Sequence, residues 1–188
     1  MKIITTFILA FLLTSVVTAQ VRIGDVVLPY KVTFGEEELT LNGAGMRSII
    51  GIDTYSGGLY TKQKFNDPKV ILDSDEPMSI RLNIVSKKVT NSRMIKVFRK
   101  GFDDALFGNT ENMDDRINDF LKLFSSPMQI NDYFDLVYIK GKGIKTFKNG
   151  EELGFIEGRD FKYALFKIWL GNEPACKLIK GGMLGLSQ

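Results

Sequence analysis

An alternating segment, Pro77–Ser86, constrains the fold of this chain most tightly. Within it, every second side chain is apolar: Met78, Ile80, Leu82 and Ile84. Successive side chains of a strand point to opposite faces, so this period of two predicts a strand with one buried and one solvated face. Such a strand is typical of an antiparallel sheet that packs against a second layer on one side only.

Two amphipathic helices are predicted directly after this strand. Apolar residues recur at helical spacing from Met94 to Phe107 and again from Met113 to Phe124, and Pro127 closes the second run. Adjacent helices of this kind need an apolar partner, which the buried face of a sheet supplies. The pattern therefore indicates an α+β domain in which helices cover one face of an antiparallel sheet.

Further strand patterns lie on both sides of the helical region: Val26–Phe34 as an edge strand, Glu37–Leu41, Met46–Thr61 as one long strand or a strand pair, Tyr133–Lys140, Ile144–Lys148 and Glu152–Glu157. Asn149-Gly150 is typical of a type I′ hairpin turn. A later helix is predicted over Gly158–Leu170, and short helical turns over Lys69–Leu72 and after Pro174. There is no internal repeat or linker, so we expect one domain over residues 20–188.

The first 19 residues, Met1–Ala19, are interpreted as a signal peptide. They contain one lysine, an apolar run from Ile3 to Val17 and the small residues Val17-Thr18-Ala19 at the end. The run has about 15 residues, fewer than the roughly 20 that span a bilayer. We therefore expect an exported protein, periplasmic or secreted, with no membrane span after the signal is removed.

Composition excludes several classes of function. Histidine is absent and Cys176 is the only cysteine, so the commonest metal ligand, the usual general base and every Cys-His or Ser-His triad are missing. We expect no metal site and no cofactor. The net charge is only +3 and no contiguous basic block accompanies the aromatic residues, which argues against nucleic acid as a partner.

The stretch Leu41–Tyr60 contains the main candidate site. Asn42-Gly43-Ala44-Gly45 predicts a glycine-rich turn, because glycine tolerates positive φ and close backbone approach. Arg47 follows it, and its planar guanidinium is well shaped to hold a carboxylate or a phenolate. The alternative is a surface arginine beside a hairpin.

Two motifs in this chain resemble the chalcone isomerase superfamily. One is Gly43-Ala44-Gly45-Met46-Arg47 followed by Gly58-Leu59-Tyr60, and the other runs from Asn149 to Pro174 and is similar to the bacterial chalcone-isomerase-like group. The resemblance covers about Leu28 to Leu186. It implies an open-faced β-sandwich of chalcone isomerase type, a curved antiparallel sheet covered on one face by helices, with a ligand cleft between the layers.

Comparison with the plant isomerases of that superfamily argues against catalysis. Their substrate is held by the motif arginine, a threonine on the long strand, a tyrosine and an asparagine on the first helix and a hydroxyl residue on the later helix. Arg47 matches the arginine, but the other positions hold Tyr55, Arg93, Lys100 and Ile168. Only one of the five positions matches, so no catalytic residue is assigned, and Arg47 and Tyr55 are the candidates for the alternative in which the protein is an isomerase.

The plant fatty-acid-binding branch fits better, because there the same arginine and a strand tyrosine grip the ligand carboxylate. Arg47 and Tyr55 match both residues. We therefore expect a small amphiphilic or carboxylate ligand, with Arg47, Tyr55, Phe98, Phe102 and Ile168 as ligand-binding residues. Plain core packing is the alternative for the phenylalanines.

One geometric condition decides whether Arg47 and Tyr55 can share a ligand. They are eight residues apart, which on an unbroken strand is about 26 Å. A turn near Gly51 would instead make them cross-strand neighbours about 5 Å apart. Three hypotheses remain: a non-catalytic binder of a fatty acid or similar carboxylate, an isomerase or intramolecular lyase, and a ligand-free envelope interaction protein.

Overall fold

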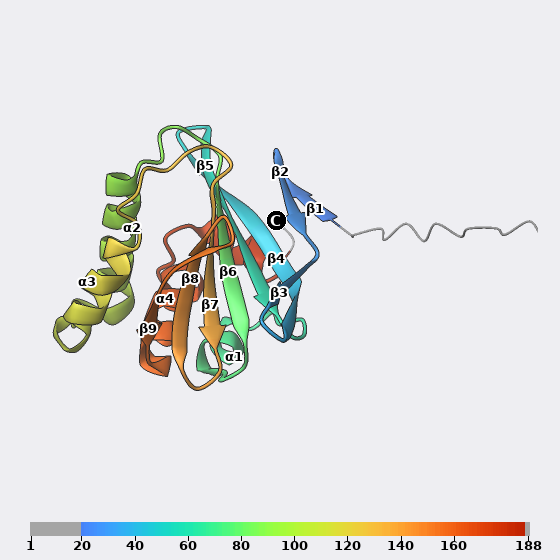
Figure 1. The fold of residues 1–188 in the computed structure, drawn as a ribbon. Helices are drawn as coiled ribbons and strands as arrows, with labels where there is room; N and C mark the ends of the chain where they lie inside the picture. Colours follow the sequence, from blue (N-terminus) through green and yellow to red (C-terminus); the bar gives the residue numbers. More distant parts are fainter. Residues whose placement is uncertain (1–19, 187–188) are drawn as a thin grey trace, which may run out of the picture.

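The computed structural model describes residues 20–186, so the predicted signal peptide lies outside the described residues. Seven antiparallel strands form a curled sheet in which each strand pairs with the next along the chain (Figure 1). They are β3 (Lys31–Phe34), β4 (Glu37–Ile49), β5 (Ile52–Thr61), β6 (Met78–Ile84), β7 (Tyr133–Ile139), β8 (Gly143–Lys148) and β9 (Glu151–Glu157). The predicted α+β class, with an antiparallel sheet and helices, is confirmed.

A separate two-stranded sheet, β1 (Gln20–Ile23) with β2 (Val26–Pro29), lies beside β4 (Figure 1). The prediction of one edge strand over Val26–Phe34 is wrong, because the chain leaves one sheet at Pro29 and enters the other at Lys31. The hydroxyl of Tyr60 donates to the carbonyl of Pro29 at 3.0 Å and fixes this crossing to the main sheet.

The helices are α1 (Pro68–Asp73), α2 (Asn91–Leu106), α3 (Asp114–Lys122), α4 (Arg159–Leu170) and α5 (Lys177–Met183), with a 3-10 turn η1 at Glu111–Met113. Helix α4 packs against β8, α1 and α2, while α3 packs on α2 and β9 and α5 packs on β4 and β5. None of the helices described between residues 20 and 186 is both long and apolar enough to cross a membrane.

The alternation that predicted β6 is confirmed on its apolar face, but the other face is only partly solvated because Ser79 is fully buried. Met78, Ile80, Leu82 and Ile84 are all buried in the main core, whereas Arg81 and Asn83 are partly exposed on the other face. The core is completed by aromatic side chains from the helices, which contact one another edge to face: Phe98, Phe102, Phe120, Phe161 and Trp169.

Gly43 and Gly45 do not form a turn, and that prediction is wrong. Both lie inside β4, and neither has a positive φ. Helix α5 packs so closely on them that a Cβ on Gly43 would lie 2.1 Å from the carbonyl oxygen of Gly182, and one on Gly45 would lie 2.6 Å from that of Leu178. The glycines are needed because another backbone passes where a side chain would stand.

The chain reverses at Ile50-Gly51 instead, so Met46–Thr61 forms parts of two strands. Ile50 has φ 50° and Gly51 has φ 71°. Positive φ at both central residues is the signature of a type I′ turn, which matches the twist of the strands that it joins. This reversal satisfies the condition for Arg47 and Tyr55 to meet.

Candidate functional site

Arg47 on β4 and Tyr55 on β5 are directly opposite each other in the hairpin. The guanidinium carbon of Arg47 lies 5.7 Å from the centroid of the Tyr55 ring. Side chains of opposed residues share a face of the sheet, here the face that the helices cover. The two residues that were expected to hold a ligand together are therefore neighbours.

A β-bulge at Thr54 sets which side chains surround this pair. The register passes from Arg47 opposite Tyr55 to Ser48 opposite Asp53, which leaves Thr54 without a partner in β4. The hydroxyl of Thr54 donates to the carbonyl of Arg47 at 2.8 Å and stabilises the irregularity. An extra residue in one strand breaks the alternation of faces, so Tyr55 shares its face with Ile52 rather than with Asp53.

A pocket of about 420 Å³ opens between the tip of this hairpin, the loop before α2 and the first turns of α2. Tyr55, Thr54 and four cations, Arg47, Lys88, Arg93 and Lys96, supply its polar lining. The rest of the wall is apolar: Ile49, Ile50, Ile52, Val89, Met94 and Val97. None of these twelve lining residues is acidic. The pocket therefore combines an apolar wall with positive charge.

Arg47 is half-buried and lacks a polar partner for its side chain. Among residues 20–186, its guanidinium makes no ion pair and donates no hydrogen bond. The nearest acidic side chain on the hairpin, Asp53, accepts a hydrogen bond from Ser48 and does not line the pocket. A guanidinium has five N–H donors, so this one is available to an incoming anion.

Tyr55 is 2 % exposed, and its phenol oxygen accepts a hydrogen bond from the indole Nε1 of Trp169 at 3.3 Å. Burial raises the pKa of Tyr55 above its ordinary value of 10.0, despite the opposing effects of Trp169 and Arg47. The phenol is therefore neutral at physiological pH. Its own proton has no acceptor among the described residues and remains available for donation.

The other three predicted ligand-binding residues lie elsewhere. Phe98 and Phe102 are fully buried in the aromatic cluster of the core, and Ile168 is packed on Gly101, where a Cβ would lie 2.7 Å from its methyl carbon. None of the three lines the pocket beside Arg47. A ligand role for them stays a prediction.

The apolar wall of the pocket was not assigned to a site from the sequence. Met94 and Val97 belong to the apolar stripe of α2 and were interpreted as core. Ile49 and Ile52 form the last pair of the hairpin, and their role depends on the bulge at Thr54. The one available signal was three isoleucines, Ile49, Ile50 and Ile52, beside the glycine at which a turn was one of two possibilities.

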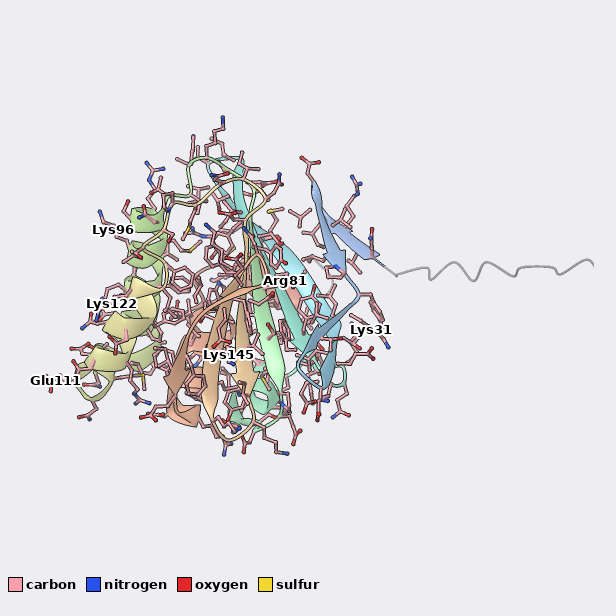
Figure 2. The ribbon with its side chains drawn as sticks, in the orientation of Figure 1. Lys31, Arg81, Lys96, Glu111, Lys122 and Lys145 are labelled. Atoms are coloured by element: carbon pink, nitrogen blue, oxygen red, sulfur yellow. The ribbon has the colours of Figure 1, made fainter. Side chains whose placement is uncertain are left out.

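Two other buried or partly buried cations, Arg81 and Lys162, have partners within the fold. Arg81 and Asp135 form a bidentate ion pair with both distances 2.7 Å, and Figure 2 shows Arg81 over the middle strands. The ammonium of Lys162 donates to the carbonyls of Ile71, Leu72 and Ser74 at 2.7–2.9 Å. Within the described part of the chain no three acidic or cysteine side chains are grouped to hold a metal ion.

The sequence model of the family described as chalcone isomerase-like matches residues 20–185, which is almost all of the described chain. The chain belongs to this family. Its fold is similar to the crystal structure of an Arabidopsis thaliana fatty-acid binding protein, with a TM-score of 0.69 and 21 % sequence identity over 85 % of this chain and 92 % of that one. A search of curated proteins gave no match for this chalcone isomerase-like protein.

Proposed function

We propose that this chalcone isomerase-like protein binds a fatty acid or a similar amphiphilic carboxylate without catalysis, in the pocket beside Arg47 and Tyr55. The observation that carries the proposal is a half-buried guanidinium with no polar partner among residues 20–186, set over a buried phenol in a pocket whose lining has no acidic residue. An unpaired charge is costly away from water, and a carboxylate would satisfy it.

The size and composition of the pocket suit such a ligand. A volume of about 420 Å³ falls within the range of small-molecule sites, which are mostly apolar with a few convergent polar groups. The carboxylate would accept from Arg47, and the alkyl chain would lie against Ile49, Ile52 and Val97. Each buried methylene would contribute about 0.8 kcal/mol before the costs of binding.

One further point supports the proposal without testing it. The fold is shared with the Arabidopsis thaliana fatty-acid binding protein. We also propose that the protein belongs to the bacterial group of this family, on the motif from Asn149 to Pro174. Export to the periplasm or the medium is proposed on the predicted signal peptide, Met1–Ala19.

The neutral phenol of Tyr55 suits hydrogen-bond donation to a bound carboxylate and argues against a role as general base. A phenol that is held neutral by burial donates a hydrogen bond well but is a poor general base near neutral pH. Turnover of chalcone-like enones that disappears in Tyr55→Phe would instead support an isomerase. Native mass spectrometry that finds no small molecule in the purified protein, together with no uptake of added ligand, would support the ligand-free alternative.

Uptake of a fluorescent fatty acid by the purified protein tests the proposal. Arg47→Ala should weaken uptake at least roughly tenfold, since a hydrogen bond to a charged group is worth about 1.5–3 kcal/mol. Arg22→Ala is the matched control, because Arg22 is an exposed cation on β1 and its loss changes the net charge equally. Equal uptake by the two variants would overturn the assignment of the carboxylate to Arg47.

A further inference from the structure

The tip of the β4–β5 hairpin is apolar and stands out into solvent. Ile50 is 97 % exposed, and its neighbours Ile49 and Ile52 are 45 % and 39 % exposed. Figure 1 shows this tip at the same end of the molecule as the N-terminal end of α2. Three exposed isoleucines around Gly51 at the end of a hairpin contribute little to a core, so folding alone does not account for them.

Ile50 is also a poor residue for its own backbone conformation. It has φ 50°, a region that β-branched residues strongly disfavour. The equivalent position of the β8–β9 turn is Asn149, with φ 52°, and asparagine tolerates this conformation. The chain thus carries a strained, exposed apolar side chain where a polar one would be more stable. A residue that is unfavourable for its own backbone conformation and gains no packing contact in return indicates a functional role.

Cations lie on the α2 side of this tip, while the exposed Asp53 lies on the hairpin beside it, paired with Ser48. The sequence has no acidic residue between Glu76 and Asp103, although the whole chain is only slightly basic. Four cations of this stretch, Lys87, Lys88, Arg93 and Lys96, are exposed, and within the described part of the chain none of them forms an ion pair. Figure 2 shows Lys96 near the N-terminal end of α2. Acidic side chains are also absent from the first turn of that helix.

We propose that the β4–β5 hairpin tip docks the protein on an anionic lipid bilayer. The isoleucines 49, 50 and 52 enter the interface between head groups and acyl chains, and the four cations on the α2 side lie at the level of the phosphates. Apolar insertion and attraction to anionic lipid act together in membrane-surface binding. A narrow convex tip suits a soft surface better than a protein partner, because stable protein interfaces bury about 800 Å² on each side.

Docking by this tip also explains why the pocket opens where it does. Ile49, Ile50 and Ile52 line the pocket and form the tip, so its mouth would face the bilayer. This step rests on the proposed function. An amphiphile could then pass between bilayer and pocket without exposing its alkyl chain to water.

Co-sedimentation of the purified protein with phosphatidylcholine vesicles, with and without phosphatidylglycerol, tests the docking. Ile50→Asn should weaken binding to the anionic vesicles roughly tenfold, because one fully exposed isoleucine no longer inserts. Its thermal midpoint should be equal or higher, since asparagine fits the turn. The matched control is Phe107→Asn, which also replaces an exposed apolar residue at positive φ (75 % exposed, φ 54°) at the C-terminal end of α2. That control should bind like the wild type.

A second variant tests the charge. Lys87→Gln with Lys88→Gln should weaken binding to anionic vesicles and reduce its salt dependence, with little change on neutral ones. The docking is overturned if the wild type does not bind anionic vesicles, as expected of a tip that serves a protein partner, or if Ile50→Asn binds them as the wild type does. These vesicles contain no fatty acid and the uptake assay contains no vesicles, so failure of one proposal is distinct from failure of the other.

Discussion

Lys162 and Arg47 are both cations on the helix-covered side of the sheet, yet their surroundings differ. Lys162 is fully buried and donates to three carbonyls at the end of α1. Arg47 is half-buried, and its side chain has no polar partner among the described residues. Lys162 links α4 to the end of α1, whereas the donors of Arg47 are available to a ligand. The two cations therefore differ in whether their N–H donors already have acceptors within the fold, and this difference indicates which of them is free to bind a ligand.

Removing each of the two charges in a separate variant should distinguish their roles by the effect on stability. Lys162→Met should lower the free energy of unfolding by about 3 kcal/mol or more, because three buried carbonyls lose their donor. Arg47→Met should change it by less than about 0.5 kcal/mol, since no hydrogen bond is lost. Urea denaturation measures both. Equal losses would mean that Arg47 is structural too.

The pH dependence of unfolding sharpens the same contrast. Burial, helped by the charge of Arg159, lowers the pKa of Lys162 from 10.5 to about 8. Between these values the unfolded chain binds more protons than the folded one, so the free energy of unfolding should rise with pH. The rise from this one group should be about 3 kcal/mol between pH 8 and 10.5. This rise should be absent from Lys162→Met. If the free energy of unfolding of the two proteins depended on pH in the same way, the contribution of Lys162 would be excluded.

The sheet and its helical cover could be predicted because they rest on local periodicity. The alternation of β6 and the apolar stripe of α2 follow from which side chains face the core. The role of Gly43 and Gly45 could not be predicted, because α5, which packs on them, comes more than 130 residues later in the chain. Their sequence is equally compatible with a turn.

The candidate site was predictable only in part. Arg47 and Tyr55 were identified as a pair from family resemblance, and the hairpin makes them neighbours. The bulge at Thr54 has no clear signature, since Ile49, Ile50 and Ile52 fit either face of a strand. If the same residues formed a regular strand without the bulge, Tyr55 would share a face with Asp53, and the pocket would acquire an acid. Which side chains line the pocket therefore depends on the one-residue shift in the pairing of β4 and β5 at Thr54.

The two type I′ turns offer a second contrast, with a smaller expected effect. Asn149 accepts from the backbone N–H of Tyr133 at 2.9 Å and donates to Asp132 at 2.8 Å. Asn149→Ala should therefore lower the free energy of unfolding by about 2 kcal/mol, through two lost hydrogen bonds and a poorer fit to positive φ. Ile50→Ala, at the corresponding position, should change it by less than about 0.5 kcal/mol. Thermal unfolding compares the pair directly, and a large loss in Ile50→Ala would show that the tip is structural.

The smallest effect expected is a gain. Ile50→Asn replaces a β-branched residue at φ 50° by one that tolerates this conformation, and the side chain that it removes is almost fully exposed. The free energy of unfolding should rise by about 0.5–1 kcal/mol. Ile50→Val keeps the β-branch and should give no gain, so the two variants separate backbone strain from the loss of exposed apolar surface. If asparagine destabilised the hairpin, Ile50 would have a packing role, and its exposure would no longer indicate that the tip serves a contact outside the chain.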